Sequence, residues 1–291
     1  MHKAEQNGDS YFISMTDMMV GVLFVFIIMV SYFVLELQKK MDSNEVIPRP
    51  VHESIVRNKD QKIDHLEKQI ERLRRNSWEL YAIAANNTRS EIIRAISDVL
   101  KREGIKFTAD PVMGVIRLEG DGLFKQGSSD LEARVDAVER INKLSSALYD
   151  NIECYGLHAK EQGLTLSDDF DNCNPDNIFI EAVYVEGHSD SDGFRGVLRD
   201  GSRNNLELSA RRATNTYAQM AVYTPSLTSL VNPLGQQALS TAAYGSQRPV
   251  VPNSNLRNKA LNRRIDLRFV MYLPKDEKAR EALQRKVELL Q

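Results

Sequence analysis

The spacing of hydrophobic positions changes along this chain, and each spacing predicts a different kind of element. Residues 18–35 read MMVGVLFVFIIMVSYFVL and carry no charge. With the apolar residues that flank it, this run is long enough for one helix to cross a bilayer core of about 30 Å. It is also too long for the apolar region of a cleavable signal peptide. We therefore predict a retained membrane helix over residues 11–37, preceded by a short tail over residues 1–10.

After a polar stretch broken by Pro48 and Pro50, apolar residues recur every seven positions. One heptad position holds Val56, Ile63, Ile70, Ser77 and Ala84, and the other holds Leu66, Leu73 and Leu80. β-branched residues at the first position with Leu at the second favour a parallel two-stranded coiled coil. We expect a linker and a dimeric coiled-coil helix over residues 38–103. The alternative is one amphipathic helix that lies on the domain that follows.

From Gly104 onward, short strand patterns alternate with amphipathic helix patterns. Strands are predicted at 112–118, 178–185, 241–244 and 265–272, and helices at 129–149 and 205–223. This order predicts an α+β domain over residues 104–273, a mixed sheet with helices on one face. Residues 150–177 and 191–203 have the composition of insertions, and residues 274–291 that of a charged helical tail.

Charge and motifs narrow the function classes. The 38 Lys and Arg residues nearly balance the 40 Asp and Glu residues, which argues against a general nucleic-acid partner. The chain contains no GxSxG, HExxH or Walker motif, and no paired CxxC motifs. His188 beside Asp190 could indicate hydrolytic chemistry, but no nucleophile–base pair stands at a recognisable spacing. We expect no enzyme activity and no cofactor.

Five ordered blocks resemble OmpA-type peptidoglycan-binding domains: GLFKQGS at 122–128, VEGHSD at 185–190, NLELSARRA at 205–213, AYGSQRPVVPN at 243–253 and LNRRIDLRF at 261–269. The resemblance implies that Asp190 and Arg212 hold the zwitterionic diaminopimelate of the peptidoglycan stem peptide. A carboxylate suits an ammonium group, and a guanidinium suits a carboxylate. Asn205 and Leu208 share a helix face with Arg212 and are expected to join the site.

The same resemblance implies a mainly structural role for Asn262 and Arg264 of the NRR element. One departure from the family pattern concerns the segment between Asp190 and Asn205, which is longer than usual. We expect this segment to reshape or partly cover the rim of the pocket.

Asp17 lies at the start of the apolar run. The residue either caps the helix or reaches the lipid headgroups, or it is an intramembrane acid with a role in ion handling. Residues 14–24 (SMTDMMVGVLF) resemble stator subunits of the MotB type. In that family, two such helices stand inside a ring of five polytopic partner subunits, and the aspartate relays protons or sodium ions. The resemblance implies the same role for Asp17.

The cysteine-bearing insertion, the long 191–203 segment and the few basic residues before the membrane helix look more like ZorB, the MotB-like family of the Zorya anti-phage defence system. That resemblance implies a ZorA-like partner around a dimer of this chain. A flagellar-type MotB subunit and a purely structural peptidoglycan tether remain the alternatives.

Orientation is indicated by two conflicting features. Lys39, Lys40 and Arg49 follow the span and only Lys3 precedes it, which slightly favours a cytoplasmic C-terminus. Cys154 and Cys173 lie close together in a polar loop without a histidine pattern, which suits a disulfide in an oxidising compartment, two free thiols being the alternative. Together with the domain type, the cysteines lead us to expect a single-pass protein of the bacterial inner membrane, with a cytoplasmic N-terminus and a periplasmic C-terminal domain.

Overall fold

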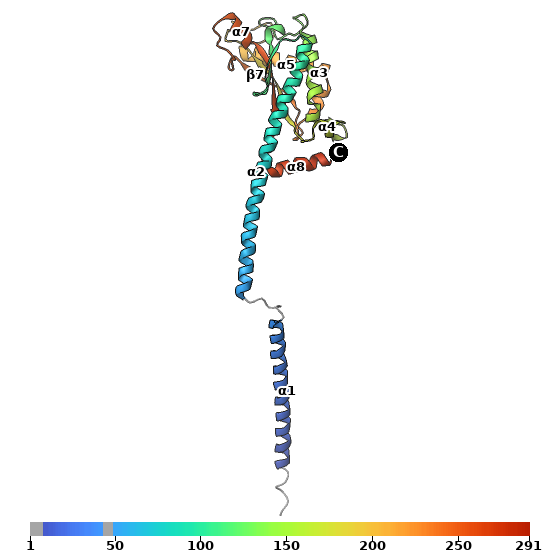
Figure 1. Ribbon diagram of the computed structural model, residues 1–291. Helices are drawn as coiled ribbons and strands as arrows, with labels where there is room; N and C mark the ends of the chain where they lie inside the picture. The colour runs from blue at the N-terminus through green and yellow to red at the C-terminus, as the bar shows by residue number, and fades with distance from the viewer. Residues whose placement is uncertain (1–7, 43–48) are drawn as a thin grey trace, which may run out of the picture. The chain divides into compact units, whose positions relative to one another are not determined.

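The computed structural model describes the backbone of residues 8–42 and 49–291, and the side chains of residues 18–41, 50–70 and 78–291 (Figure 1). The chain divides into two compact units, Met1–Glu71 and Arg72–Gln291. The first unit contains α1 (Gly8–Asp42) and the beginning of α2 (Arg49–Arg102).

Helix α1 confirms the predicted apolar helix. Within it, Met18–Met41 is long and apolar enough to cross a membrane, with a mean hydropathy of 2.7. The large apolar side chains of this stretch are exposed, as a lipid-facing helix requires. Asp17 lies in the helical backbone of α1, but its side chain falls outside the described residues.

The first unit leaves the apolar seam of α2 uncovered. Val56 is 42% exposed and Ile63 52%, and Leu66 and Ile70 are exposed to a similar degree. Pro50 stands in the first turn of α2, where a missing backbone N–H costs the helix nothing. The seam is therefore available to a second helix, and the coiled-coil dimer stays a prediction.

The end of α2 belongs instead to the core of the second unit. Its buried apolar residues are Tyr81, Ala85, Ile92, Ile93, Ile96 and Leu100. Leu80, at a predicted seam position, is 59% exposed, while Ala84 packs against this core. For this stretch the structure shows the alternative of one helix packed on its own domain. The second compact unit, Arg72–Gln291, therefore includes this end of α2.

The main sheet of the second unit has five strands in the order β1-β2-β8-β5-β7. The strands are β1 (Phe107–Asp110), β2 (Val115–Glu119), β5 (Ile180–His188), β7 (Leu239–Gly245) and β8 (Arg264–Met271). Only the β5–β7 pair is parallel among them, so the sheet is mixed. Four of the five strands were predicted within a few residues, and the short edge strand β1 was not.

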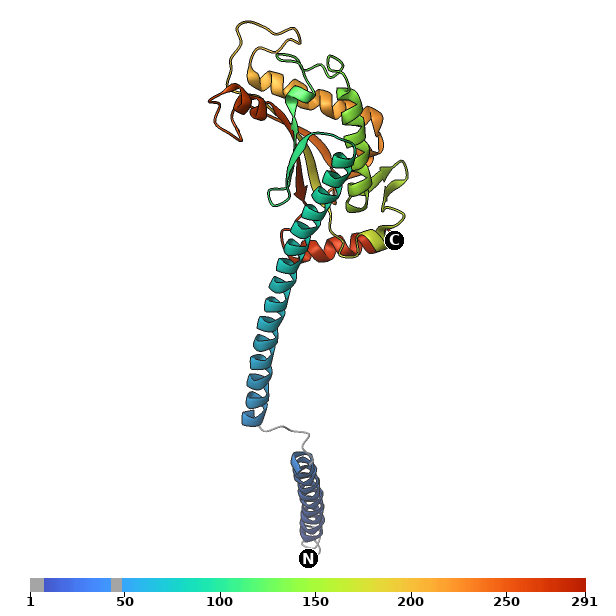
Figure 2. The same ribbon diagram turned by 45° about the horizontal axis from the view of Figure 1, so that its top comes forward.

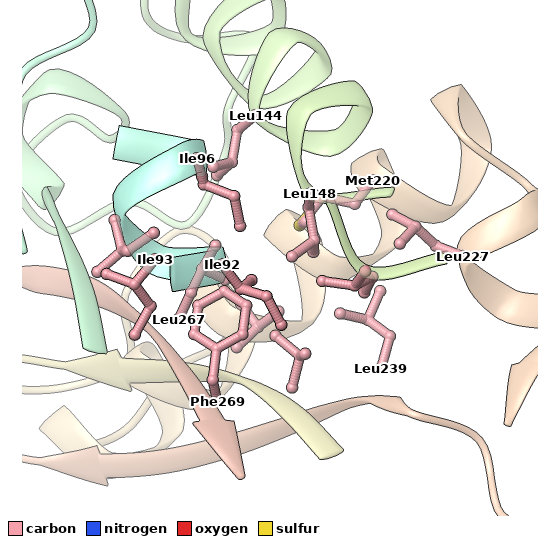
Figure 3. Packing of buried hydrophobic residues seen from close by; sticks show 14 of the residues in the cluster. Ile92, Ile93, Ile96, Leu144, Leu148, Met220, Leu227, Leu239, Leu267 and Phe269 are labelled. Carbon is pink, nitrogen blue, oxygen red and sulfur yellow. The ribbon is translucent and has the colours of Figure 1, made fainter. Parts of the chain in front are cut away.

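Helices cover one face of this sheet, which confirms the predicted fold class. Helices α3 (Ala137–Ile152) and α5 (Asn205–Tyr223) lie side by side over it, next to the end of α2 (Figures 1 and 2). Strand β8 alternates as a half-polar strand should, with Ile265, Leu267 and Phe269 in the core. Figure 3 shows Ile92, Leu144 and Leu148 meeting Leu267 and Phe269 in this layer.

A glycine sets the closest approach between helix and sheet. A Cβ atom at Gly187, in the GHSD block at the end of β5, would run into the backbone carbonyl of Ser209 on α5. Only glycine allows this contact. The same packing brings the carboxyl end of β5 against the first turns of α5, where the candidate residues lie.

The insertion at 150–177 forms part of a second, smaller layer. Strands β3 (Leu157–Lys160) and β4 (Gly163–Thr165) pair with β6 (Leu230–Val231) in a three-stranded sheet. Next to it lie η2 (Glu153–Tyr155), α4 (Phe170–Cys173), α6 (Ser226–Ser229) and the tail helix α8 (Glu277–Glu288). Leu283 and Val287 of α8 share a small core with Phe170 and Phe179, so the predicted helical tail packs on its own domain.

Candidate ligand-binding site

Asp190 lies two residues after the end of β5 and is nearly buried. Its Oδ2 accepts a hydrogen bond from Arg263 Nη1 at 2.5 Å, and its Oδ1 accepts one from the backbone N–H of Asp192 at 3.0 Å. The side chain is 10% exposed. Both carboxylate oxygens therefore already have a partner within the domain.

Arg263 links Asp190 to a second carboxylate. Its Nε and Nη2 donate to Asp121 at 2.7 and 2.6 Å, the two-pronged geometry that makes Arg–carboxylate pairs strong. The hydrogen bonds to Asp121 are the main reason that the pKa of Arg263 lies above its usual value. Asp121 belongs to η1 (Gly120–Gly122), and Arg263 stands between α7 (Leu256–Asn262) and β8. Neither residue was singled out from the sequence.

Arg212 lies on α5 and contacts the loop that follows η1. Its Nε donates to the carbonyl oxygen of Ser128 at 2.9 Å and its Nη2 to that of Lys125 at 3.2 Å. Its guanidinium lies over the ring of Phe124, 5.2 Å from the ring centroid. The residue is 3% exposed, and burial lowers its pKa to about 10. Among the described residues, Arg212 makes no ion pair with Asp190.

The other two residues predicted for the site, Asn205 and Leu208, make contacts within the domain. Asn205 Nδ2 donates to the carbonyl oxygens of Asp190 at 3.2 Å and Asp192 at 2.9 Å, so it fixes the chain after β5. Leu208 is 5% exposed, so its side chain contributes to packing rather than to an open apolar surface. Asn204 caps α5 by accepting a hydrogen bond from the N–H of Glu207, which explains where the helix begins.

The long segment 191–203 is tied to the domain at both ends. Near its start, Lys259 Nζ lies 2.6 Å from Asp192 Oδ1. Near its end, Asp200 Oδ2 accepts a hydrogen bond from Ser129 Oγ at 2.7 Å. In Figure 2 it is the long gold loop that leads into α5. The segment therefore fastens the loop whose carbonyl groups hold Arg212.

Asn262 and Arg264 have the structural roles expected of them. Asn262 is fully buried, and its Oδ1 accepts hydrogen bonds from the N–H groups of Val250 and Val251 at 2.9 and 3.2 Å. Arg264 Nε donates to Asp266 at 3.0 Å on the sheet face away from the helices. Arg263 and Arg264 are adjacent in sequence but point to different parts of the domain.

Glu186, His188 and Asp266 are the one group of described residues with the composition of a metal site. His188 Nε2 lies 3.4 Å from Asp266 Oδ2 and 3.8 Å from Glu186 Oε2, and all three residues are 1% exposed. Arginines already balance the two carboxylates: Arg268 bonds Glu186, Arg264 bonds Asp266, and Arg117 lies 3.8 Å from Asp266. A divalent cation would add charge to a buried layer that already carries an excess of positive charge. The group is better described as an internal ion network.

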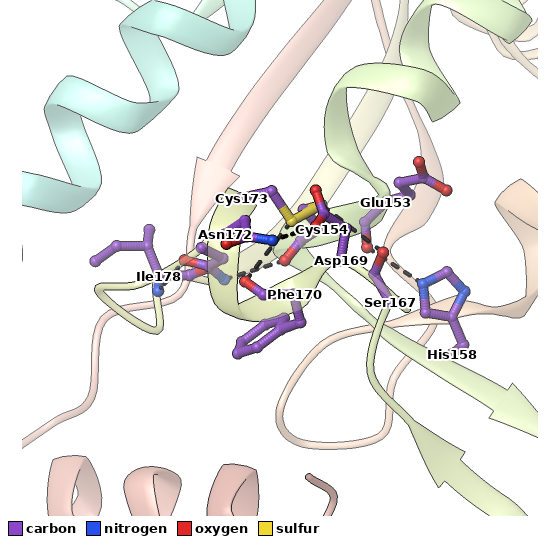
Figure 4. Close-up of a disulfide and its surroundings, with 10 residues drawn as sticks. Glu153, Cys154, His158, Ser167, Asp169, Phe170, Asn172, Cys173 and Ile178 are labelled. Carbon is purple, nitrogen blue, oxygen red and sulfur yellow. Dashed lines mark hydrogen bonds between the residues drawn. A yellow bond between two sulfur atoms is a disulfide. The ribbon is translucent and has the colours of Figure 1, made fainter.

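The predicted disulfide between Cys154 and Cys173 is present, with the two Cα atoms 6.1 Å apart (Figure 4). It joins η2 to α4. Asn174, which follows α4, donates from Nδ2 to the carbonyl oxygens of Cys154 at 3.0 Å and Ile178 at 2.7 Å. A covalent bond and a buried amide therefore close the insertion onto the start of β5.

No protein-family model matches the chain, and no curated protein matches it by sequence. Among solved structures, a MotB-like protein from Desulfovibrio vulgaris is similar, with 20% identity over 66% of this chain and 94% of that chain, at a TM-score of 0.44. The cell wall anchor of the T6SS from Pseudomonas aeruginosa shows 19% identity over 62% and 97%, at a TM-score of 0.41. The periplasmic domain of Helicobacter pylori MotB (residues 78–256) shows 20% identity over 59% and 85%, at 0.39. Function is therefore inferred from the residues of this chain.

Proposed function

We propose that this protein is the cell-wall-anchored subunit of an ion-driven motor in the bacterial inner membrane. The observation that carries the proposal is the placement of Asp190, just after β5, and Arg212, on the neighbouring α5, within a domain that follows an apolar helix of membrane length. A carboxylate and a guanidinium at one site match a zwitterionic ligand. The diaminopimelate unit of peptidoglycan has this chemistry, with an ammonium and a carboxylate on one carbon.

The direct test is binding to cell walls. Full-length protein in detergent should co-sediment with purified peptidoglycan sacculi, and Asp190→Asn should weaken that binding by more than tenfold. Truncating one partner of a desolvated charge pair costs roughly 2–5 kcal/mol. Glu288→Gln on α8 removes the same charge far from the site and serves as the control. Equal binding by Asp190→Asn and wild type would exclude this site as the anchor.

The motor half of the proposal rests on Asp17. Protonation neutralises a carboxylate and removes the cost of holding its charge in the membrane, so each ion transfer can bias the conformation of a partner. A pure tether would not need this acid. We propose a polytopic partner of the ZorA type, five copies around a dimer of this chain, and a role in Zorya anti-phage defence. Co-purification of the partner with the full-length chain, together with a phage-protection assay, tests this assignment.

The exposed seam of α2 supports the dimer. Ile63 and Ile70 stand on one stripe of a helix that leaves them about half exposed, at 52% and 49%. A second copy held in the same membrane would bury that stripe in a parallel coiled coil. Ile63→Cys should form a disulfide-linked dimer on mild oxidation in membranes, and Lys62→Cys on another face should not. Failure of both to cross-link would leave the seam without its proposed partner.

The disulfide supports the proposed orientation. A bond between Cys154 and Cys173 persists in an oxidising compartment, which favours a periplasmic second unit next to the proposed peptidoglycan ligand. Protease added to the outer face of spheroplasts should then digest the second unit and leave the membrane helix.

A further inference from the structure

Arg263 is hydrogen-bonded to the carboxylate of Asp190, which the ammonium group of a ligand would need. The chain of ion pairs Asp121–Arg263–Asp190 becomes less exposed step by step: the three side chains are 42%, 18% and 10% exposed. Arg263 is thus more accessible than Asp190 and holds its Oδ2 at 2.5 Å. The other oxygen of Asp190 is occupied by the N–H of Asp192.

Arg212, the arginine of the proposed site, also has partners within the domain. Arg212 gives two of its donors to the carbonyl oxygens of Ser128 and Lys125 and is nearly buried. Among the described residues, Asp121, Asp190, Arg212 and Arg263 together carry no net charge. Arg263 pairs with both carboxylates and Arg212 bonds carbonyl groups, so each of the four side chains has a partner without a ligand.

We propose that Arg263 is a latch, an internal cation that the ammonium group of the ligand must displace from Asp190. This inference rests on the proposed binding of peptidoglycan by Asp190. The ligand class is an amino acid with its ammonium beside its carboxylate, as at the free end of diaminopimelate. One cation replaces another at Asp190, so the buried carboxylate is never left unpaired.

Asp121 is the residue that would hold Arg263 after Arg263 has released Asp190. Asp121 accepts its two hydrogen bonds from Nε and Nη2 of Arg263, whereas Asp190 accepts one from Nη1, so the two carboxylates use different nitrogens of the guanidinium. Arg263 can therefore release Asp190 and keep a bidentate partner at the more exposed end. A site that must first open binds with an affinity reduced by the fraction of molecules in the open state. If about one molecule in ten is open, removing the latch raises the affinity about tenfold.

The test compares sacculus binding by full-length wild type with that of Arg263→Met, which keeps an unbranched apolar side chain and removes the guanidinium and its charge. Arg263→Met should bind about tenfold more tightly, and free meso-diaminopimelate should displace it at a correspondingly lower concentration. Arg263→Lys keeps the charge but cannot bond both carboxylates, so it should show a smaller gain. Arg280→Met, on α8, removes the same charge elsewhere and should bind as wild type does.

Each outcome of the binding test either supports or overturns the latch. Unchanged binding by folded Arg263→Met and Arg263→Lys would overturn the latch, with the peptidoglycan function intact. Weaker binding would also overturn it and would show instead that Arg263 positions Asp190 for the ligand. Binding by the variants but not by wild type would support the latch in its strongest form. If neither wild type nor either variant binds sacculi, the proposed function and the latch both fall. Thermal unfolding of each variant identifies loss of binding through misfolding, and Arg263→Lys keeps the test open if Arg263→Met does not fold.

Discussion

Trp78 on α2 donates a hydrogen bond from Nε1 to the carbonyl oxygen of Pro274, 2.8 Å away, and so ties the helix to the segment before α8. Tyr81, one turn further on, donates to the carbonyl oxygen of Asn177 at 3.3 Å. These two contacts hold α2 where it enters the second unit. They join residues that are 196 and 96 positions apart in the sequence.

Removing the tryptophan bond should loosen this end of the domain. Trp78→Phe keeps most of the apolar surface and deletes the donor, at a cost of about 1 kcal/mol in the free energy of unfolding. We expect a melting temperature lower by about 2–4 °C for a unit of this size. Leu80→Ala, at an exposed position of the same turn, is the control and should change little. Equal melting temperatures for Trp78→Phe and wild type would show that the bond contributes nothing measurable.

Local sequence patterns predicted the helix of the candidate site well. Helix α5 was expected at 205–223 and has those bounds, because Asn204 caps it and the apolar period continues to its end. Helix α3 was expected from residue 129 but begins at Ala137. Residues 128–129 instead offer their carbonyl groups to Arg212 and Asn215. That use of the loop depends on tertiary contacts, which helical periodicity does not report.

Two features of the structure could not be predicted from periodicity alone. The heptad seam of α2 includes Leu80, which is exposed, whereas its neighbour Tyr81 is buried in the core of the domain. A heptad pattern looks the same whether a second chain or the chain's own sheet covers it. Arg263 and Arg264 are likewise adjacent arginines that the sequence does not distinguish. Strand β8 begins at Arg264, and Arg263, which lies outside the strand, is the one that bonds Asp190.

The disulfide should hold the insertion together. In the chain-entropy model, a bridge between residues separated by 19 positions stabilises the folded state by about 3 kcal/mol. The double variant Cys154→Ser, Cys173→Ser should therefore unfold at lower temperature, with the small core around Phe170 losing hydrogen-exchange protection first. Alkylation of the unreduced protein followed by mass spectrometry provides the companion check. Two free thiols in periplasm-exported protein would refute both the bond and the orientation it supports.

The ion network on the sheet should make stability depend on pH in two opposing ways. Burial raises the pKa of Glu186, but its interactions with the neighbouring His188 and Arg268 outweigh burial and lower the pKa to about 2. Its stabilising effect is complete above its ordinary pKa of 4.5 and is lost as the pH falls toward about 2. Burial raises the pKa of Asp266, so its ionised form disfavours folding. Protonation of Asp266 on acidification therefore increases the stability of the folded domain.

Substitutions should separate the two contributions. Between pH 5 and about pH 2, Glu186→Gln should lose less stability than wild type, because it lacks the carboxylate with the lowered pKa. Asp266→Asn should lose more. The measurement is the free energy of unfolding in urea at a series of pH values, read as a slope so that any constant loss from the substitution cancels. Slopes that change in the same direction for both variants would contradict the assignment.

Asp17 should be essential for activity but not for folding. Asp17→Asn keeps the shape of the side chain and removes its titration, so the protein should insert, dimerise and bind its partner yet fail in the phage-protection assay. Asp42→Asn, at the other end of α1 and outside Met18–Met41, is the matched control and should remain active. Full protection by Asp17→Asn would remove the ion relay and leave a structural tether.

Arg212 and Leu208 should differ in what their loss affects. Arg212→Ala should weaken sacculus binding by more than tenfold, because the ligand's carboxylate loses its partner. It should also lower the melting temperature, because the carbonyl groups of Ser128 and Lys125 lose their donors.

Leu208→Ala empties a buried position and should cost about 2–5 kcal/mol of stability, with a smaller effect on binding by the molecules that remain folded. Sacculus co-sedimentation at a temperature well below both melting points, corrected for the folded fraction, compares the two variants. Arg212→Ala with a lowered melting temperature and undiminished binding would assign Arg212 to the loop alone. In that case Asp190 would need another residue beside it to hold the ligand's carboxylate.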